Sequence, residues 1–206
     1  PERKNRVISQ KEKEITAYHE GGHALVAASL KNSDPVHKVS IISRGMAGGY
    51  TLKLPLEDQH LRTKKQFLSD LAMMLGGFVA EKLTFGDVST GASNDLKEAS
   101  SLARSLVTKY GMSERLGPIT FGNTEEMVFL GREMTTEKNY SENVANQIDE
   151  EVSAHIKQAY DAATKILSSK KKVLIAIAKK LIEKETLEQE EFVELLRPFK
   201  IKQVEV

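Results

Sequence analysis

Two histidines and a glutamate stand close together in the stretch AYHEGGHALVAASL, residues 17–30. His19 and His23 are four residues apart, so on an α-helix their side chains point the same way, one turn from each other. Two imidazoles in that arrangement can bind one metal ion. Glu20 lies one helical step round, where its carboxylate reaches a water on the metal. The spacing therefore predicts zinc-dependent hydrolysis with Glu20 as the base.

The competing interpretation is a chance match, in which both histidines are ordinary side chains of an amphipathic helix. Gly21 and Gly22 favour the site, because a glycine inside a helix costs roughly 1 kcal/mol relative to alanine. A locally unfavourable sequence of this kind is typical of a functional position. Close packing of the two glycines against another helix explains them equally well.

A third metal ligand has to come from another part of the chain. The sequence contains no cysteine, so the ligand is a carboxylate or a further histidine. Spacing leaves three candidates, Glu81, Asp87 and Asp95. Glu81 lies on a predicted helix, whereas Asp95 stands at a predicted helix start, where the helix dipole favours a carboxylate. These criteria leave the choice between Glu81 and Asp95 open.

Two capping boxes predict the helices nearest to these residues. Ser9 and Glu12 begin a helix that runs to about residue 31, which places the two histidines in its middle. Thr63 and Gln66 begin a second helix, KKQFLSDLAMMLGGFVAEKL. Its paired glycines, 76 and 77, predict the close approach of another backbone.

Two short strands, Val36–Ile42 and Tyr50–Leu54, are predicted around the glycine-rich loop RGMAGG and form a small hairpin or ribbon. The edge of the second strand is expected to pair with the main chain of an extended substrate, which makes recognition tolerant of sequence. His37 and Tyr50 are candidates for stabilising an oxyanion, a task that zinc alone can also perform.

The remaining elements are predicted to be helical. Asn94 or Ser93 is expected to cap a helix that ends near Tyr110. The C-terminal half is expected to be entirely helical, because its apolar residues keep a helical spacing. Its helices are expected at about 141–168, 171–185 and 187–196. The sequence thus predicts a mainly α fold with one small β-ribbon.

Composition excludes several classes of protein. The 30 lysines and arginines nearly balance the 29 aspartates and glutamates, so nucleic acid is not an expected partner. The longest apolar runs fall far short of the roughly 20 residues of a membrane-spanning helix. No signal peptide pattern opens the chain. We therefore expect these 206 residues to form a soluble globular unit.

Beyond the histidine motif, a series of segments runs through most of the chain: PERKNRVIS, AYHEGGHALV, LGGFVAEKLTFGDVSTGASNDL, KYGMSERLGPITFG, FLGR and YSENVANQIDEEV. In type and order these segments resemble the peptidase domain of the FtsH family of membrane-anchored, ATP-dependent zinc metalloproteases. The series is far more specific than the histidine motif alone. Two departures concern glycines, since Gly21 replaces a usual alanine and Gly48 a common leucine, and neither is a proposed ligand.

The resemblance implies a complete set of site residues. It implies that His19, His23 and Asp95 hold one zinc ion per protomer, and that Glu20 is the catalytic base. Glu81 is then expected to orient a ligating histidine, since such histidines usually donate their second nitrogen to a carboxylate or carbonyl. A salt bridge on the helix surface is the alternative interpretation of Glu81.

The resemblance also implies a larger protein. Residues 1–9 are expected to be the linker from a preceding ATPase module, which alone would bind ATP. Residues 10–200 are expected to be the peptidase domain, with a catalytic half at 10–135 and a helical half at 136–200, followed by a tail at 201–206. The full-length protein is expected to be a homohexamer on the cytoplasmic side of the bacterial inner membrane, or on an organellar membrane, held there by an N-terminal anchor.

The predicted function is a zinc-dependent endopeptidase domain that cleaves unfolded or damaged membrane and soluble proteins delivered by the ATPase module. The alternative is a catalytically idle helical module that helps an ATPase ring to assemble. The presence of all four residues, His19, Glu20, His23 and Asp95, favours the enzyme, because an idle module has no use for the complete set.

Overall fold

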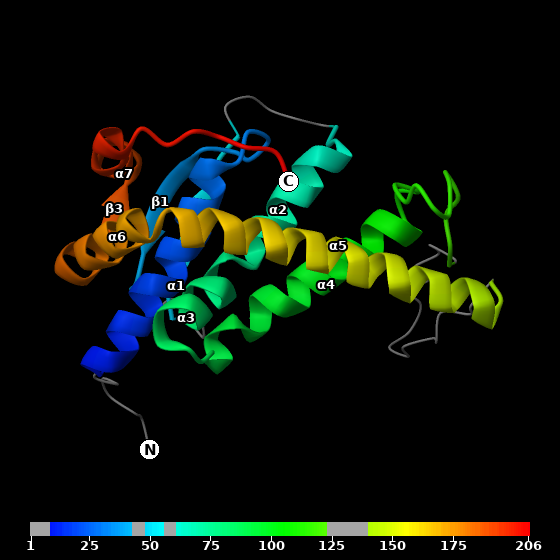
Figure 1. The fold of residues 1–206 in the computed structure, drawn as a ribbon, viewed down its shortest axis with the longest axis horizontal. Helices are drawn as coiled ribbons and strands as arrows, with labels where there is room; N and C mark the ends of the chain where they lie inside the picture. Colours follow the sequence, from blue (N-terminus) through cyan, green and yellow to red (C-terminus); the bar gives the residue numbers. More distant parts are fainter. Residues whose placement is uncertain (1–8, 43–47, 56–60, 123–139) are drawn as a thin grey trace, which may run out of the picture.

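A computed structural model describes residues 9–42, 48–55, 61–122 and 140–206 (Figure 1). In chain order its elements are α1 (Gln10–Ser29), β1 (Val36–Ser40), β2 (Tyr50–Lys53), α2 (Lys64–Met74), α3 (Gly76–Phe85), the short 3-10 helix η1 (Thr90–Ala92), α4 (Ser93–Thr108), α5 (Glu142–Ser169), α6 (Lys171–Lys184), β3 (Thr186–Glu188), α7 (Gln189–Leu196) and η2 (Arg197–Phe199). The predicted mainly α fold with a small β-ribbon is confirmed. None of the helices in the described ranges combines the length and hydrophobicity that a bilayer crossing requires.

Both predicted capping boxes are confirmed. The hydroxyl of Ser9 accepts a hydrogen bond from the backbone N–H of Glu12, whose carboxylate accepts from the N–H of Ser9. Thr63 and Gln66 make the same reciprocal pair at the start of α2. These caps satisfy N–H groups that have no partner inside the helix, and so fix where α1 and α2 begin.

The sheet has three antiparallel strands in the order β2-β1-β3, so β2 lies at an edge. The predicted β1–β2 pairing is confirmed, with Val39 opposite Thr51. The all-helical C-terminal half needs a correction, because β3 interrupts it between α6 and α7. Glu185 ends α6 in a left-handed conformation, at φ 63°, and turns the chain so that Leu187 pairs with Val39. The side of β1 opposite β2 offers hydrogen bonds to β3, and these outweigh the helical pattern of the local sequence.

The single helix predicted from residue 64 onward is two helices, α2 and α3, separated at Leu75. The break lies beside the predicted close approach of backbones. A Cβ built on Gly76 would lie 2.9 Å from the carbonyl oxygen of Gly22, so α1 and α3 touch backbone to backbone there. Only glycines fit at this crossing.

The start of α4 also differs from the prediction. Its N-cap is Ala92, which has no capping side chain, and the side chain of Asn94 donates to Glu98 instead. The helix continues from η1, whose own cap is the hydroxyl of Ser89 accepting from the N–H of Gly91. The chain is thus already turning helically before the predicted cap, and Asp95 keeps its predicted place in the first turn.

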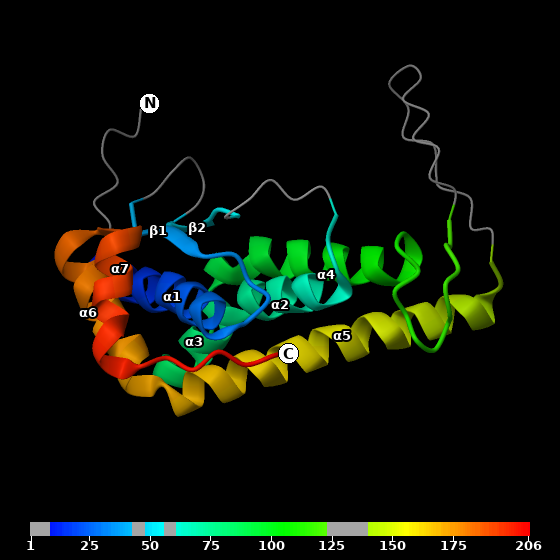
Figure 2. The ribbon, with the colours of Figure 1, turned by 90° about the horizontal axis from the view of Figure 1, so that it is seen from above.

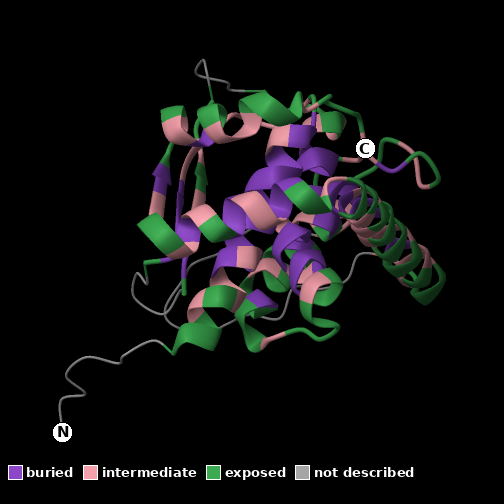
Figure 3. Ribbon diagram, turned by 60° about the vertical axis from the view of Figure 1, so that its left-hand side comes forward, coloured by how far each residue is buried: buried purple, intermediate pink, exposed green. Residues whose placement is uncertain are grey.

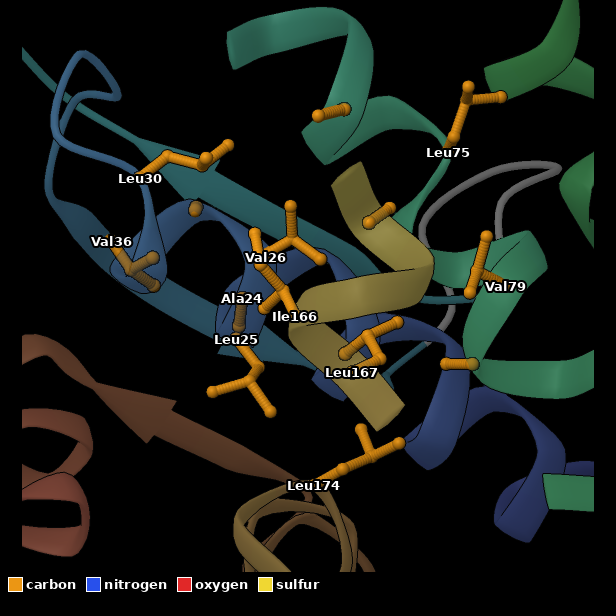
Figure 4. Packing of buried hydrophobic residues seen from close by; sticks show 14 of the residues in the cluster. Ala24, Leu25, Val26, Leu30, Val36, Leu75, Val79, Ile166, Leu167 and Leu174 are labelled. Carbon is orange, nitrogen blue, oxygen red and sulfur yellow. The ribbon is translucent and has the colours of Figure 1, made fainter. Parts of the chain in front are cut away.

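The helix α1 lies at the centre of the molecule, where it contacts α2, α3, α5, α6, β1 and β2. Figure 1 and Figure 2 show α5 running along the helical layer, opposite the sheet in the second view. Buried residues gather where these elements meet (Figure 3). Figure 4 shows Leu25 of α1, Leu167 of α5 and Leu174 of α6 in this one core.

The C-terminal segment returns to the end of α1. The N–H of Lys31 donates to the carbonyl of Val204, and the N–H of Val204 donates to the carbonyl of Ser29. The C-terminal segment thereby supplies one donor and one acceptor to the backbone at the end of the first helix.

Some sequence predictions lie outside the described residues. They are the linker at 1–9 except for Ser9, most of the loop RGMAGG, and the segment FLGR.

Candidate metal centre

His19 and His23 project from the same side of α1 toward α3 and α4, as their spacing predicts. Both are buried, and their Nε2 atoms lie 3.0 Å apart. The ring of His19 packs directly on Gly77 of α3, where an added Cβ would lie 2.7 Å from Nδ1. Gly77 therefore makes room for an imidazole, a role that the glycine pair did not reveal in the sequence.

Asp95 completes a triangle with the two imidazoles. Its Oδ2 lies 3.1 Å from Nε2 of His19 and 3.5 Å from Nε2 of His23. A tetrahedral zinc ion with ligands at about 2.0–2.1 Å separates neighbouring ligand atoms by about 3.3 Å. The three donor atoms thus stand at the spacing of one tetrahedral cation, and two imidazoles with a carboxylate suit zinc.

Of the three candidates for the third ligand, the structure brings only Asp95 to this triangle. Asp87 is exposed, and its carboxylate accepts a hydrogen bond from the backbone N–H of Val88. Glu81 reaches the other side of the His19 ring, where Oε1 lies 2.7 Å from Nδ1. Glu81 is only 2% exposed, so a salt bridge on the helix surface is excluded for this residue.

The far nitrogens of both rings are held by fixed acceptors. Nδ1 of His23 donates to the carbonyl oxygen of Met73 at 2.7 Å. A carbonyl can only accept, so the proton sits on Nδ1 and the lone pair of Nε2 points into the triangle. Glu81 holds Nδ1 of His19 in the same way, and its second oxygen accepts from the N–H of Ser89. Glu81 thereby links α1 to the turn that leads into α4 and Asp95.

The electrostatics of the triangle favour a bound cation. Burial alone would lower the pKa of His19, but hydrogen bonds to Asp95 and Glu81 outweigh it and raise this pKa to about 9. Burial would likewise raise the pKa of Asp95, but the hydrogen bonds with His19 and His23 hold it well below its ordinary value. In the metal-free protein a proton on His19 therefore supplies the positive charge that the carboxylates require.

Glu20 is buried beside the triangle and faces the edge strand. Its Oε2 accepts a hydrogen bond of 2.8 Å from the hydroxyl of Thr51 in β2. Burial raises the pKa of the Glu20 carboxyl, and the nearby His23 and His19 oppose this only in part. Sequence reasoning missed Thr51, because only the packing of β2 on α1 brings it to Glu20.

The two candidates for stabilising an oxyanion stand in the sheet. Nδ1 of His37 lies 3.3 Å from Oε1 of Gln189 in α7, so this ring contacts the C-terminal helices. Tyr50 is half-buried at the start of β2, where it pairs with Ser40. Neither position assigns an oxyanion role to these side chains.

The sequence matches the family model of peptidase family M41 over residues 6–195. It is 58% identical over 191 residues to the ATP-dependent zinc metalloprotease FtsH 1 of Thermomicrobium roseum, covering 93% of this chain and 29% of that protein. It is 53% identical over 203 residues to the FtsH of Chloroflexus aggregans, covering 97% of this chain and 31% of that protein. The chain spans less than a third of the length of these relatives.

Proposed function

The chain belongs to peptidase family M41, and from this premise we propose that it is a zinc endopeptidase domain in which His19, His23 and Asp95 hold the metal and Glu20 is the base. The observation that carries the assignment is the triangle of donor atoms, with edges of 3.0, 3.1 and 3.5 Å. The relatives are named zinc metalloproteases, which supports the choice of metal.

The residues of the chain divide the work of hydrolysis. Zinc, when bound, supplies a Lewis acid that lowers the pKa of water. Glu20 takes a proton from the attacking water on Oε1, the oxygen that Thr51 does not hold, and passes it to the leaving amine. Its raised pKa suits this exchange, because a base that later acts as an acid works best near the pH of the reaction. Glu81 and the carbonyl of Met73 keep the two imidazoles oriented.

The proposed substrates are unfolded or damaged polypeptides of membrane and soluble origin. The edge position of β2 supports this proposal, because an extended chain can add to the sheet there through main-chain hydrogen bonds that read little sequence. The relatives are named ATP-dependent zinc metalloproteases, so we propose that an ATPase module of the full-length protein delivers the substrate. Residues 1–9 would be its linker, residues 10–135 and 136–200 the two halves of the peptidase, and residues 201–206 a tail.

We also propose that the full-length protein is a homohexamer anchored on the cytoplasmic side of a bacterial inner membrane, or in an organellar membrane. An apolar groove between α3, α4 and α5 supports packing between protomers. It is lined chiefly by Leu75, Phe78, Leu96, Val152, Ile156 and Tyr160. Sedimentation of this chain at micromolar concentration tests the proposal, and a strict monomer would show that other parts of the full-length protein hold the ring together.

Metal content tests the ligand assignment. Asp95→Ala should abolish stoichiometric zinc, whereas Glu81→Ala should weaken binding by about 10 to 100-fold, the usual effect of losing a group that orients a ligand. If zinc bound normally to the Asp95 variant and was lost only from the Glu81 variant, the proposed ligand set would be wrong.

Hydrolysis of an unfolded protein tests the base. Glu20→Gln keeps the shape of the side chain but removes its proton acceptor, so the rate should fall at least about 100-fold with zinc content and helicity unchanged. Cleavage at the wild-type rate by the zinc-loaded variant would exclude Glu20 as the base, and inactivity of the wild-type domain itself would favour the idle assembly module.

A further inference from the structure

Alternate residues of the edge strand β2, and Gly49 just before it, face the helical layer. Gly49 and Thr51 lie against Glu20, and Lys53 lies against Asp70 of α2, at 2.6 Å from Nζ to Oδ1. Such alternation is the normal period of a strand. Here it places every inward-facing position from 49 to 53 in contact with a carboxylate, and two of the three contact the same one.

Thr51 makes the polar contact with the base. Its Oγ1 lies 2.8 Å from Oε2 of Glu20 and 3.3 Å from the backbone carbonyl oxygen of the same residue. A hydroxyl has one proton to donate, and the shorter contact to the charged group takes it. The hydroxyl therefore fixes Oε2 of the Glu20 carboxylate and leaves Oε1 as the oxygen that it does not bond.

Gly49 brings the strand close enough for that contact. A Cβ at this position would lie 2.9 Å from both Cγ and Oε1 of Glu20, and 2.7 Å from the carbonyl oxygen of Ser40. A side chain there would push the approach to β2 away from α1. The base is thus enclosed between its own helix and the strand, with no room for another residue type at position 49.

We propose that Thr51 is a positioning residue of the peptidase, which holds the Glu20 carboxylate in its working orientation and ties that orientation to the strand on which the substrate lies. The inference rests on the proposed function of Glu20 as the base. It adds that the base and the substrate-binding edge move as one unit, because the same strand carries the hydroxyl on one face and forms the edge of the described sheet.

A glutamate side chain has three rotatable bonds, and a misplacement of about 1 Å at a reacting group can cost about 100-fold in rate. Burial does not by itself choose among the orientations of the carboxylate. The hydrogen bond from Thr51 does, and the ion pair between Lys53 and Asp70 holds the far end of the strand in place. The side chains of Lys53 and Asp70 are nearly as buried as the site itself, at 11% and 10% exposed.

The test compares Thr51→Val with Thr51→Ser in the zinc-loaded domain. Valine keeps the shape and loses the hydroxyl, so kcat should fall about 10 to 100-fold while KM stays within about twofold. Serine keeps the hydroxyl and should stay within about threefold of the wild type. Thr164→Val is the matched control, because the hydroxyl of Thr164 is buried and has no hydrogen-bond partner in the described part of the chain.

A double variant shows whether Thr51 acts through Glu20. In single-turnover reactions, Glu20→Gln combined with Thr51→Val should be no slower than Glu20→Gln alone, since the base is already lost. Binding of an uncleaved peptide to the Glu20→Gln protein, measured by fluorescence, should not change when Thr51→Val is added. This readout does not depend on activity.

Three results would overturn the inference while leaving the proposed function intact: wild-type kcat in Thr51→Val, a serine variant as slow as the valine variant, or a full multiplicative loss in the double variant. A wild-type rate in Glu20→Gln would instead reject the proposed function and this inference together. If Thr51→Val does not fold, Thr51→Ala replaces it in every comparison.

Discussion

The buried histidine pair of α1 and the single buried histidine of α5 differ in how many of their ring nitrogens have hydrogen-bond partners. At the candidate metal centre, each ring of His19 and His23 has a partner on both nitrogens, from a carbonyl, a carboxylate or the opposite ring. On α5, His155 is just as buried, yet its Nε2 has no hydrogen-bond partner among the described residues. Histidines that are equally buried therefore differ in whether all of their ring nitrogens are hydrogen-bonded.

The difference distinguishes the hydrogen-bonded cluster of His19 and His23 from the single ring of His155. A buried polar atom without a partner costs roughly 1–3 kcal/mol, so the connected cluster is the more stable arrangement, and it also fixes the orientation of both rings. The cluster around His19 draws partners from α1, α3 and α4, whereas His155 has charged neighbours but lacks a bond on Nε2. A pair of imidazoles with every nitrogen engaged is thus a stronger sign of function than burial.

The largest expected effect comes from forcing α1 and α3 apart beneath the cluster. Gly22→Ala adds a Cβ that would lie 2.6 Å from the Cβ of Ala80 and closer still to the carbonyl oxygen of Gly76. Overpacking against a backbone costs about 1–3 kcal/mol or more. We expect a loss of about 2–3 kcal/mol in the free energy of unfolding, measured by urea denaturation, together with weaker zinc binding.

Gly21→Ala is the matched control for this change. Its Cβ would meet only the flexible side chains of Ile177 and Leu174, at 3.3 and 3.5 Å. Alanine also improves helix propensity by up to about 1 kcal/mol, so stability should be unchanged or higher. Equal losses in the two variants would show that the crossing with α3 is not what requires Gly22.

A smaller effect is expected from removing one bond of the cluster. Glu81→Gln keeps the size of the side chain but replaces a charged acceptor of the His19 proton with a neutral one. Zinc affinity, measured by competition with a chelator, should fall by about 10 to 100-fold. Asp87→Asn, a change at an exposed carboxylate outside the cluster, should leave that affinity unaltered, and a similar fall there would point to a general effect of charge.

The smallest effect concerns His155. Burial, followed by Lys64, lowers its pKa, and Glu151 and Glu114 compensate only in part. The unfolded chain binds this proton near pH 6.5, whereas the folded protein resists it to lower pH. Stability from this residue is thus present above pH 6.5 and is lost as the pH falls below it.

In His155→Leu this loss should disappear. Urea denaturation of the metal-free proteins at about pH 7.5 and 5.5 should show a smaller drop for the variant than for the wild type. All other groups are common to the two proteins and cancel in the comparison. An identical drop would mean that His155 takes up its proton without hindrance in the folded state.

The local parts of the fold were predictable from the sequence. The starts of α1 and α2 follow from side chains that cap the helix within three residues, and the helical spacing of α5 follows from its apolar stripe. Strand β3 was not predictable, because its partner β1 lies about 150 residues away and three residues carry no period of their own. The break at Leu75 also depends on α1, which is distant in sequence.

The candidate site divides in the same way. Spacing alone places His19, Glu20 and His23, since one helix carries all three. The choice between Glu81 and Asp95 depends on how α3 and α4 pack on α1. The family resemblance favours Asp95, which is also the candidate whose carboxylate lies within the triangle. Thr51 had no signal in the sequence, because a threonine on a short strand is expected wherever strands occur.

Because Val204 returns to the end of α1, two backbone hydrogen bonds at the end of the first helix are among the last to form during synthesis. Ribosomes extend a chain by about 5 to 20 residues per second, so the interval between Lys31 and Val204 is on the order of 10 to 30 seconds. During most of that interval the end of α1 has not yet bonded to Val204, and β1 has not yet paired with β3. The nascent chain therefore presents the end of its first helix to the cell well before Val204 can bond to it.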